Sequence, residues 1–231
     1  MLKNTVLSAL ALAVLALGGL WLSGRSSDPA MTLLTAAPAL AQDSAAEGSE
    51  ATSETAPVVE ELVLGNADAP VTIVEYASYT CPHCANFHAD VFKKLKTDYI
   101  DTGKVKFVFR EVYFDRYGLW ASMMARCGGN TRYFGISGML FEEQKEWAAS
   151  NDPAVVVENI KTIGRKAGMD DATLQACLED AEMAQALVSA FEKNMAADGV
   201  EGTPTLFVNG TKHGNMSYDE LKALIDEALA G

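Results

Sequence analysis

Two cysteines separated by two residues, Cys81-Pro82-His83-Cys84, are the part of this sequence whose residue types and spacing could do chemistry. Two thiols at this spacing, where a predicted strand turns into a helix, are typical of a redox pair that alternates between dithiol and disulfide. Cys81 at the helix N-terminus would meet unpaired backbone N–H groups and the positive end of the helix dipole, and both stabilise a thiolate. Cys84, one turn further on, would then be the resolving thiol.

The two residues between the cysteines support the redox interpretation. Pro82 stiffens the start of the helix without the loss of a needed hydrogen bond. His83, if it is protonated or donates a hydrogen bond, stabilises the thiolate form of Cys81. Stabilisation of the reduced form makes the disulfide a stronger oxidant.

A static disulfide or half of a zinc site would use the same two cysteines. A zinc site needs two more ligands, and the candidates are His88, His213, Cys127 and Cys177. The sequence has no second C-x-x-C and no H-x-x-H, and Ala85 stands where covalent haem attachment requires histidine. We therefore expect a redox pair, with no metal ion and no cofactor.

The segments around the cysteine pair predict a small α/β sheet. Residues 71–76 form a β-branched run after Pro70, and residues 104–112 alternate between apolar and polar side chains, so both are expected to be strands. Residues 81–96 are expected to be helical, because apolar side chains recur every fourth residue at Phe87, Val91 and Leu95.

The second half of the chain predicts a helical block followed by a return to the sheet. Residues 117–197 are rich in Ala, Leu, Met and Glu, with Asp152 expected as a helix N-cap before Pro153. Residues 205–208 are expected to be a strand, followed by an Asn-Gly hairpin turn at 209–210. A final helix opens with the capping-box pattern Ser217-x-x-Glu220. The fold class is α/β, with an all-helical insertion within the sheet.

The N-terminal region predicts export from the cytoplasm. Residues 1–41 have Lys3, an uncharged run over 4–24, and an A-x-A pattern at 39–41, which is typical of a cleaved signal peptide. The uncharged run is also long enough to span a bilayer, so an uncleaved membrane anchor is the alternative. Residues 42–57 read as a flexible linker, and the folded domain is expected over 58–230.

The composition limits the class of partner. The 231 residues are 49% hydrophobic, which is enough for one well-packed domain. Lys and Arg number 18 against 31 Asp and Glu, a net charge of −13, which argues against nucleic acid as a partner. The four cysteines are too few for a fold held together mainly by disulfides.

Two segments together resemble a known family. Glu75-Tyr-Ala-Ser-Tyr-Thr-Cys-Pro-His-Cys84 and Gly202-Thr-Pro-Thr-Leu-Phe-Val-Asn-Gly210 are similar to segments of the DsbA-like thiol-disulfide oxidoreductases, from about residue 58 to the C-terminus. The resemblance implies a thioredoxin-like fold with an all-helical domain inserted between its two halves. It also implies an exported, periplasmic oxidoreductase that acts on reduced, unfolded or folding exported proteins, with a membrane or soluble redox partner that reoxidises it.

The resemblance also implies roles for individual residues. Pro204 matches the family's cis-proline, which faces the active-site disulfide, and Thr203 before it would present backbone groups to a substrate. Glu75 matches the acidic residue beneath the resolving cysteine and could relay a proton to or from Cys84, unless it is an exposed carboxylate at the strand end. We assign His88 no role and expect it at the surface or in a groove.

Some members of the family have a second disulfide within the helical domain, and the pair Cys127 and Cys177 resembles it. In an oxidising compartment two exported thiols are expected to be joined. The alternative is that these are two separate, small buried residues.

Three functions remain open at this point. The first is an oxidase that donates the Cys81–Cys84 disulfide, and the Pro-His dipeptide, characteristic of the oxidising branch, favours it. The second is a disulfide isomerase or reductase that uses the same dithiol. The third is a periplasmic chaperone or binding module whose thiols are incidental.

Overall fold

The computed structural model of the chain describes residues 57–231. The signal peptide or anchor expected over 1–41 and the linker expected over 42–57 lie outside the described residues, apart from residue 57. The described elements in chain order are β1 (Leu62–Leu64), β2 (Val71–Ala77), α1 (Pro82–Phe87), η1 (His88–Phe92), α2 (Lys93–Leu95), η2 (Lys96–Ile100), β3 (Val105–Glu111), α3 (Arg116–Cys127), α4 (Gly129–Glu142), α5 (Gln144–Trp147), α6 (Pro153–Lys166), α7 (Asp171–Glu179), α8 (Ala181–Asp198), β4 (Thr205–Val208), β5 (Thr211–His213) and α9 (Tyr218–Ala230).

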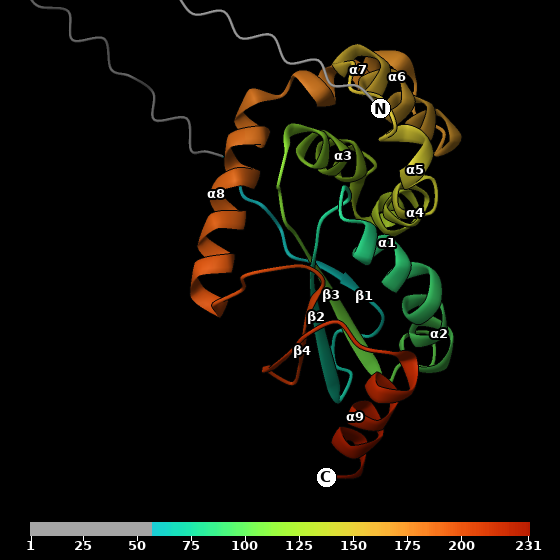
Figure 1. The fold of residues 1–231 in the computed structure, drawn as a ribbon, viewed down its shortest axis with the longest axis vertical. Coiled ribbons are helices and arrows are strands. Elements are labelled where there is room, and N and C mark those ends of the chain that lie inside the picture. Colours follow the sequence, from blue (N-terminus) through green and yellow to red (C-terminus); the bar gives the residue numbers. More distant parts are fainter. Residues whose placement is uncertain (1–56) are drawn as a thin grey trace, which may run out of the picture. The chain divides into compact units, whose positions relative to one another are not determined.

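The strands form one mixed sheet in the order β1-β3-β2-β4-β5 (Figure 1). Only the central pair of strands, β2 and β3, is parallel within the described part of the chain, and α1 to η2 form the crossover between them. The predicted strands at 71–76, 104–112 and 205–208 are present, whereas the three-residue β1 was not predicted. A strand that short leaves no alternation in the sequence to detect.

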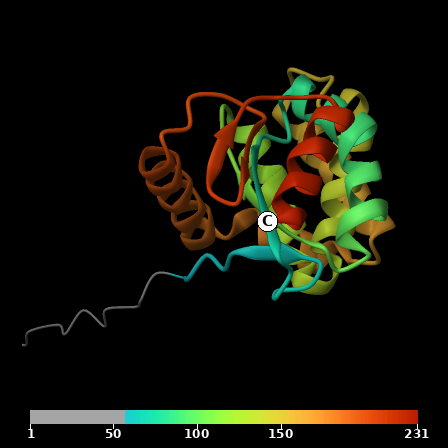
Figure 2. The same cartoon turned by 90° about the horizontal axis from the view of Figure 1, so that it is seen from below.

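Helices cover the two faces of this sheet. The α1–η2 segment and α9 lie on one face, and α8 lies on the other (Figure 2). The main core contains the inward-facing side chains of β2 and β3 together with Phe87, Val91 and Leu95 of the crossover. A smaller cluster joins Tyr76 to Phe191 and Met195 of α8.

The helical block lies between β3 and β4 in sequence and runs from α3 to α8. It joins the main core through α3 and α4, so the thioredoxin-like half and the insertion share apolar packing. This arrangement confirms the predicted fold class.

The predicted local signals at the element ends are also confirmed. The Asp152 side chain accepts a hydrogen bond from the backbone of Ala154 at the start of α6, and Ser217 and Glu220 form the capping box of α9. Asn209 and Gly210 have φ values of 47° and 84°, the left-handed backbone that a two-residue hairpin between β4 and β5 requires.

Candidate active site

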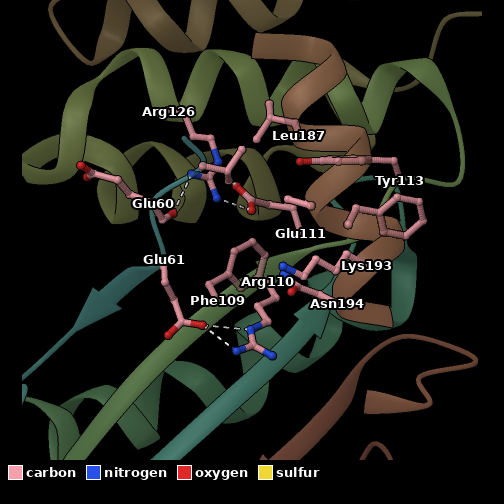
Figure 3. A pocket seen from close by; sticks show the side chains of 13 residues that line it. Glu60, Glu61, Phe109, Arg110, Glu111, Tyr113, Arg126, Leu187, Lys193 and Asn194 are labelled. Carbon is pink, nitrogen blue, oxygen red and sulfur yellow. Dashed lines mark hydrogen bonds and ion pairs between the residues drawn. The ribbon is translucent and has the colours of Figure 1, made fainter. Parts of the chain in front are cut away.

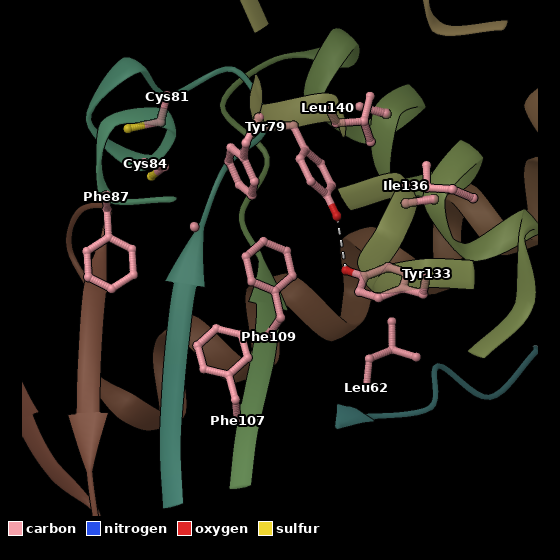
Figure 4. Close-up of a cluster of buried hydrophobic side chains, with 14 of the residues drawn as sticks. Leu62, Tyr79, Cys81, Cys84, Phe87, Phe107, Phe109, Tyr133, Ile136 and Leu140 are labelled. Atoms are coloured by element: carbon pink, nitrogen blue, oxygen red, sulfur yellow. Dashed lines mark hydrogen bonds between the residues drawn. The ribbon is translucent and has the colours of Figure 1, made fainter. Parts of the chain in front are cut away.

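Cys81 and Cys84 lie where β2 leads into α1, at the carboxyl end of the central strand. Cys81 is the N-cap of α1, and its carbonyl accepts hydrogen bonds from the backbone N–H groups of Cys84 and Ala85. Cys81 is 7% exposed and Cys84 is fully buried, and both are free thiols in the structure. Figure 4 shows the two sulfurs above Phe87, at the edge of the aromatic core. The pair therefore presents one sulfur near the surface and one behind it.

The two thiols have opposite acidities. A hydrogen bond from Cys84, then from Thr203 and the backbone amides of Cys84 and His83, lowers the pKa of Cys81 to about 5, although burial opposes this shift. The Cys81 sulfur raises the pKa of Cys84 well above its ordinary value, and burial and the Glu75 charge act in the same direction. Cys81 is thus the thiolate of the pair and Cys84 the protonated thiol. His83 is exposed, and its backbone N–H is among the groups that lower the pKa of Cys81.

The segment before β4 completes the surface around Cys81. The Thr203–Pro204 peptide bond is cis, and the Thr203 carbonyl oxygen lies 3.6 Å from Cys81 Sγ. The Thr203 hydroxyl is buried beside the two cysteines, and the Thr203 side chain lowers the pKa of both thiols. The structure therefore brings together Cys81, Cys84, Thr203 and Pro204, which sequence reasoning had grouped.

Gln144 was missed by sequence reasoning. It lies in α5 of the helical insertion and is buried, and its Nε2 donates to the carbonyl oxygens of Tyr79 at 2.7 Å and Cys81 at 3.0 Å. Both carbonyls belong to the segment between β2 and α1 that carries Cys81. Gln144 lies 65 residues from Tyr79 and 63 from Cys81 in the sequence, so no local pattern indicates these contacts.

Glu75 is fully buried in β2, so it is not an exposed carboxylate at the strand end. Its partner is His88, whose Nε2 lies 3.0 Å from Oε2 and 3.2 Å from Oε1 of the carboxylate. The expectation that His88 lies at the surface or in a groove was wrong, because the ring is buried against Phe141 of the helical insertion. Phe141 of the helical insertion thus covers the face of the segment after Cys84 on which His88 lies.

The second cysteine pair lies within the helical insertion. Cys127 and Cys177 are joined in a disulfide between α3 and α7, with 5.9 Å between their Cα atoms. Cys127 is the last residue of α3, and Cys177 lies in the second half of α7. Within residues 57–231 no group of three or more His, Cys, Asp and Glu side chains is arranged to hold a metal ion.

A cavity of about 230 Å³ lies away from the thiols, between β3 and α8 (Figure 3). Its charged side chains are largely paired with one another: Arg110 with Glu61, and Arg126 with Glu111. A more open groove of about 600 Å³ runs beside the helix that follows Cys84, between Phe87, Val91 and the start of α9. No helix of the described chain is long and apolar enough to cross a bilayer.

Comparisons with known proteins agree with this geometry. A family model described as Thioredoxin matches residues 58–227. Disulfide bond formation protein D of Bacillus subtilis is 32% identical over 198 residues, which cover 80% of this chain and 84% of that protein. A Rickettsia bellii protein named "Putative protein-disulfide oxidoreductase" is 36% identical over 170 residues, 73% of this chain and 64% of that protein. The chain spans less than two thirds of the length of the Rickettsia relatives that it matches.

Solved structures show the same fold. The crystal structure of Wolbachia pipientis alpha-DsbA1 superposes with a TM-score of 0.70 and 27% identity, over 76% of this chain and 94% of that one. Oxidised BdbD from Bacillus subtilis gives a TM-score of 0.66 and 28% identity, over 74% and 94% of the two chains. The chain therefore belongs to the thioredoxin family, among its DsbA-like thiol-disulfide oxidoreductases.

Proposed function

We propose that this protein is an exported oxidase that donates the Cys81–Cys84 disulfide to reduced, unfolded or folding proteins. The observation that carries the proposal is the opposite acidity of the two thiols, with the pKa of Cys81 lowered to about 5 and that of Cys84 raised. A thiol that ionises readily is a good leaving group. A disulfide that contains Cys81 is therefore easily passed on.

In the first step, a substrate thiolate attacks Cys81 Sγ, and the bond between the two protein sulfurs breaks. Cys84 leaves with the electron pair and takes up a proton, because its pKa is raised. In the second step, another substrate thiolate attacks the substrate sulfur of the mixed disulfide. Cys81 leaves as a stable thiolate, so the substrate loses two electrons and the protein gains them. A redox partner that accepts two electrons then restores the disulfide.

Three further residues support this chemistry. The Thr203 carbonyl lies beside Cys81 and is available to a substrate strand, which would pair with it as strands do in peptide recognition. Pro204 has no backbone N–H and shapes that edge of the site. We assign Glu75, the third of these residues, the relay of a proton to and from Cys84. The Cys127–Cys177 disulfide lies outside this chemistry, and we assign it a structural role.

Export to the periplasm is part of the proposal. The charged and apolar pattern of residues 1–41 supports it, as does the need for an oxidising compartment to keep disulfides formed. An anchor over residues 4–24 instead of a cleaved signal peptide would leave the folded domain on the same side of the membrane.

The test is oxidation of reduced, unfolded ribonuclease A by a stoichiometric amount of the oxidised protein. We expect disulfides to appear in the substrate as the protein becomes reduced, and we expect the Cys84→Ser variant to accumulate mixed disulfides at Cys81. An equilibrium with glutathione gives the reduction potential of the pair. A potential near that of reducing thioredoxins, about −270 mV, would contradict the oxidase assignment and favour a reductase.

A further inference from the structure

The buried pair of His88 and Glu75 lies close enough to Cys84 for the Glu75 charge to raise the pKa of that thiol. The Glu75 side chain is 0% exposed and the His88 side chain 8%, and both carboxylate oxygens lie within 3.2 Å of His88 Nε2. His88 follows Cys84 by four residues, so one helical turn separates the imidazole from the thiol along the same helix face. Both side chains are therefore shielded from bulk water.

The surroundings of the pair are apolar and aromatic. The His88 ring stacks on Phe141 of α4, with 3.9 Å between ring centroids, and also contacts Phe92 and Phe109. The residues opposite Glu75 on the neighbouring strands are Phe109 in β3 and Leu206 in β4. The thiol of Cys84 in α1 is the ionisable group outside the pair on which the Glu75 charge acts, and Tyr79 lies beyond the Phe109 and Phe141 rings that pack against His88.

Such surroundings restrict the charge that the pair can carry. One proton bound between a carboxyl and an imidazole leaves the pair neutral overall, whereas two protons or none leave a net charge. Burial of a net charge among aromatic rings costs free energy unless hydrogen bonds compensate it. When the pair gives up its proton, the carboxylate that remains keeps one donor, the N–H of a neutral His88.

Cys84 needs a proton at a defined step of the proposed reaction. It leaves as a thiolate when the disulfide opens and must become a thiolate again when it closes the mixed disulfide. The Cys81 sulfur, burial and the Glu75 charge all raise the pKa of Cys84, so its thiolate is short-lived and needs an acid and a base close by. Cys84 is fully buried, which keeps bulk water from serving this purpose readily.

We infer that His88 is a positioning residue that holds the Glu75 carboxyl group behind Cys84 and stabilises its carboxylate with a hydrogen bond from Nε2. This inference rests on the proposed thiol-disulfide exchange. When the disulfide opens, the proton passes from the Glu75 carboxyl to Cys84 Sγ, and Glu75 becomes a carboxylate that accepts from His88. When Cys84 closes a mixed disulfide, the same proton returns to Glu75. The proton that Cys84 gains or loses is the one that Glu75 loses or gains, so the total charge of Glu75, His88 and Cys84 is the same before and after each transfer. No other proton donor or acceptor is needed.

The test isolates the closing step. The protein carrying glutathione in a mixed disulfide at Cys81 is prepared at low pH, and release of glutathione is followed after a jump to pH values from 5 to 9. His88→Phe removes the donor but keeps an aromatic ring, and His88→Gln keeps an N–H donor. His213→Gln is the matched control, because His213 lies on the edge strand β5, where Leu206 of β4 separates it from Glu75.

We expect His88→Phe to slow glutathione release at pH 7 by about tenfold to a hundredfold, the range for loss of a hydrogen bond to a charged group. The difference should shrink toward pH 9, where hydroxide replaces the missing base. His88→Gln should recover most of the rate, and His213→Gln should match the unaltered protein. The pKa of Cys81, followed by thiolate absorbance, should be unchanged in all three variants, which a general loss of structure would not allow.

An unaltered release rate in His88→Phe across the pH range would overturn the inference. So would a slowing that is the same at every pH and that His88→Gln does not relieve. If His88→Phe does not fold, the comparison of His88→Gln with the double variant Glu75→Gln/His88→Gln decides, because the inference requires the pH dependence to vanish in the double variant. A protein that fails to oxidise ribonuclease A at all would instead contradict the proposed function.

Discussion

The two cysteine pairs of this protein contain the same chemical group in opposite electrostatic settings. Cys81 caps the N-terminus of α1, where backbone N–H groups and the positive end of the helix dipole favour a thiolate. Cys127 ends α3 and Cys177 lies in the last turns of α7, where carbonyl groups and the negative end of the dipole disfavour one. A disulfide exchanges readily only if one of its sulfurs leaves easily as a thiolate. We therefore expect the position of a cysteine along its helix to separate the proposed exchanging disulfide from the proposed structural one.

The mechanical roles of the two pairs differ as well. Cys81 and Cys84 are three residues apart and constrain only one turn, while the Cys127–Cys177 bond closes a separation of 50 residues. α7 buries a single side chain, Leu174, within the helix, so apolar packing alone attaches it weakly. The second disulfide fastens this helix to α3, which is part of the main core.

Removal of the Cys81 sulfur should have the largest effect on the rate of substrate oxidation. Cys81→Ser should lower the rate of ribonuclease oxidation by at least about three orders of magnitude, as loss of a covalent nucleophile does in other enzymes. The double variant Cys127→Ala/Cys177→Ala serves as the comparison and should retain most of the rate at a temperature where it stays folded. Equal losses in the two proteins would show that both pairs take part in exchange.

The double variant Cys127→Ala/Cys177→Ala should lose more stability than Cys81→Ser, which is the reverse of their order in activity. Cys127→Ala/Cys177→Ala should lower the free energy of unfolding by about 4 kcal/mol, the chain-entropy value for a loop of this length. Urea unfolding of the oxidised proteins measures the difference. In unaltered protein, a low concentration of dithiothreitol should open Cys81–Cys84 first, and mass spectrometry after alkylation would detect the reverse order.

The lowered pKa of Cys81 makes the stability of the reduced protein depend on pH. The pKa of Cys81 is about 5 in the folded protein and about 8.5 in the unfolded chain. The contribution of the Cys81 thiolate to the free energy of unfolding is therefore complete above pH 8.5 and is lost as the pH falls toward 5. The free energy of unfolding should therefore fall by about 1.4 kcal/mol per pH unit over this window. Cys84 adds nothing below pH 8.5, because it stays protonated in both states.

The oxidised protein is the control for this slope, since its Cys81 carries no ionisable thiol. The difference between the unfolding free energies of reduced and oxidised protein, measured at pH 5, 6, 7 and 8, removes the contribution of all other groups. A difference that stays flat from pH 5 to 8 would mean that Cys81 is not the thiolate of the pair.

Gln144 links the helical insertion to the reactive loop, and its loss should have a smaller effect. Gln144→Leu leaves the Tyr79 carbonyl buried without this donor, which costs roughly 1–3 kcal/mol of stability. The pKa of Cys81 should rise as the loop loosens. Asn159→Leu is the matched control, because it removes a side-chain amide whose Nδ2 donates to the Trp147 carbonyl oxygen within the insertion. Identical thiolate titrations in the two variants would contradict a positioning role for Gln144.

The sequence predicted the parts of this site whose signals are local. Cys81 and Cys84 are recognisable from their spacing, and the ends of α6 and α9 from cap residues only a few positions apart. The burial of His88 and Gln144 depends instead on how the insertion packs against the sheet, and no short pattern encodes that.

The smallest effect is expected at His83, the exposed residue between the two cysteines. Its backbone N–H lowers the pKa of Cys81, and that group survives substitution, so His83→Ala tests the imidazole alone. We expect the variant to be more reducing by on the order of 30 mV, which corresponds to about 1.4 kcal/mol of lost thiolate stabilisation for this couple. Because the ring is exposed, the shift should shrink as salt screens its charge. Equilibration with glutathione at low and high ionic strength measures both quantities. An unchanged potential at low salt would leave the helix N-terminus, Thr203 and the neighbouring thiol as the whole cause of the difference between the two cysteine pairs.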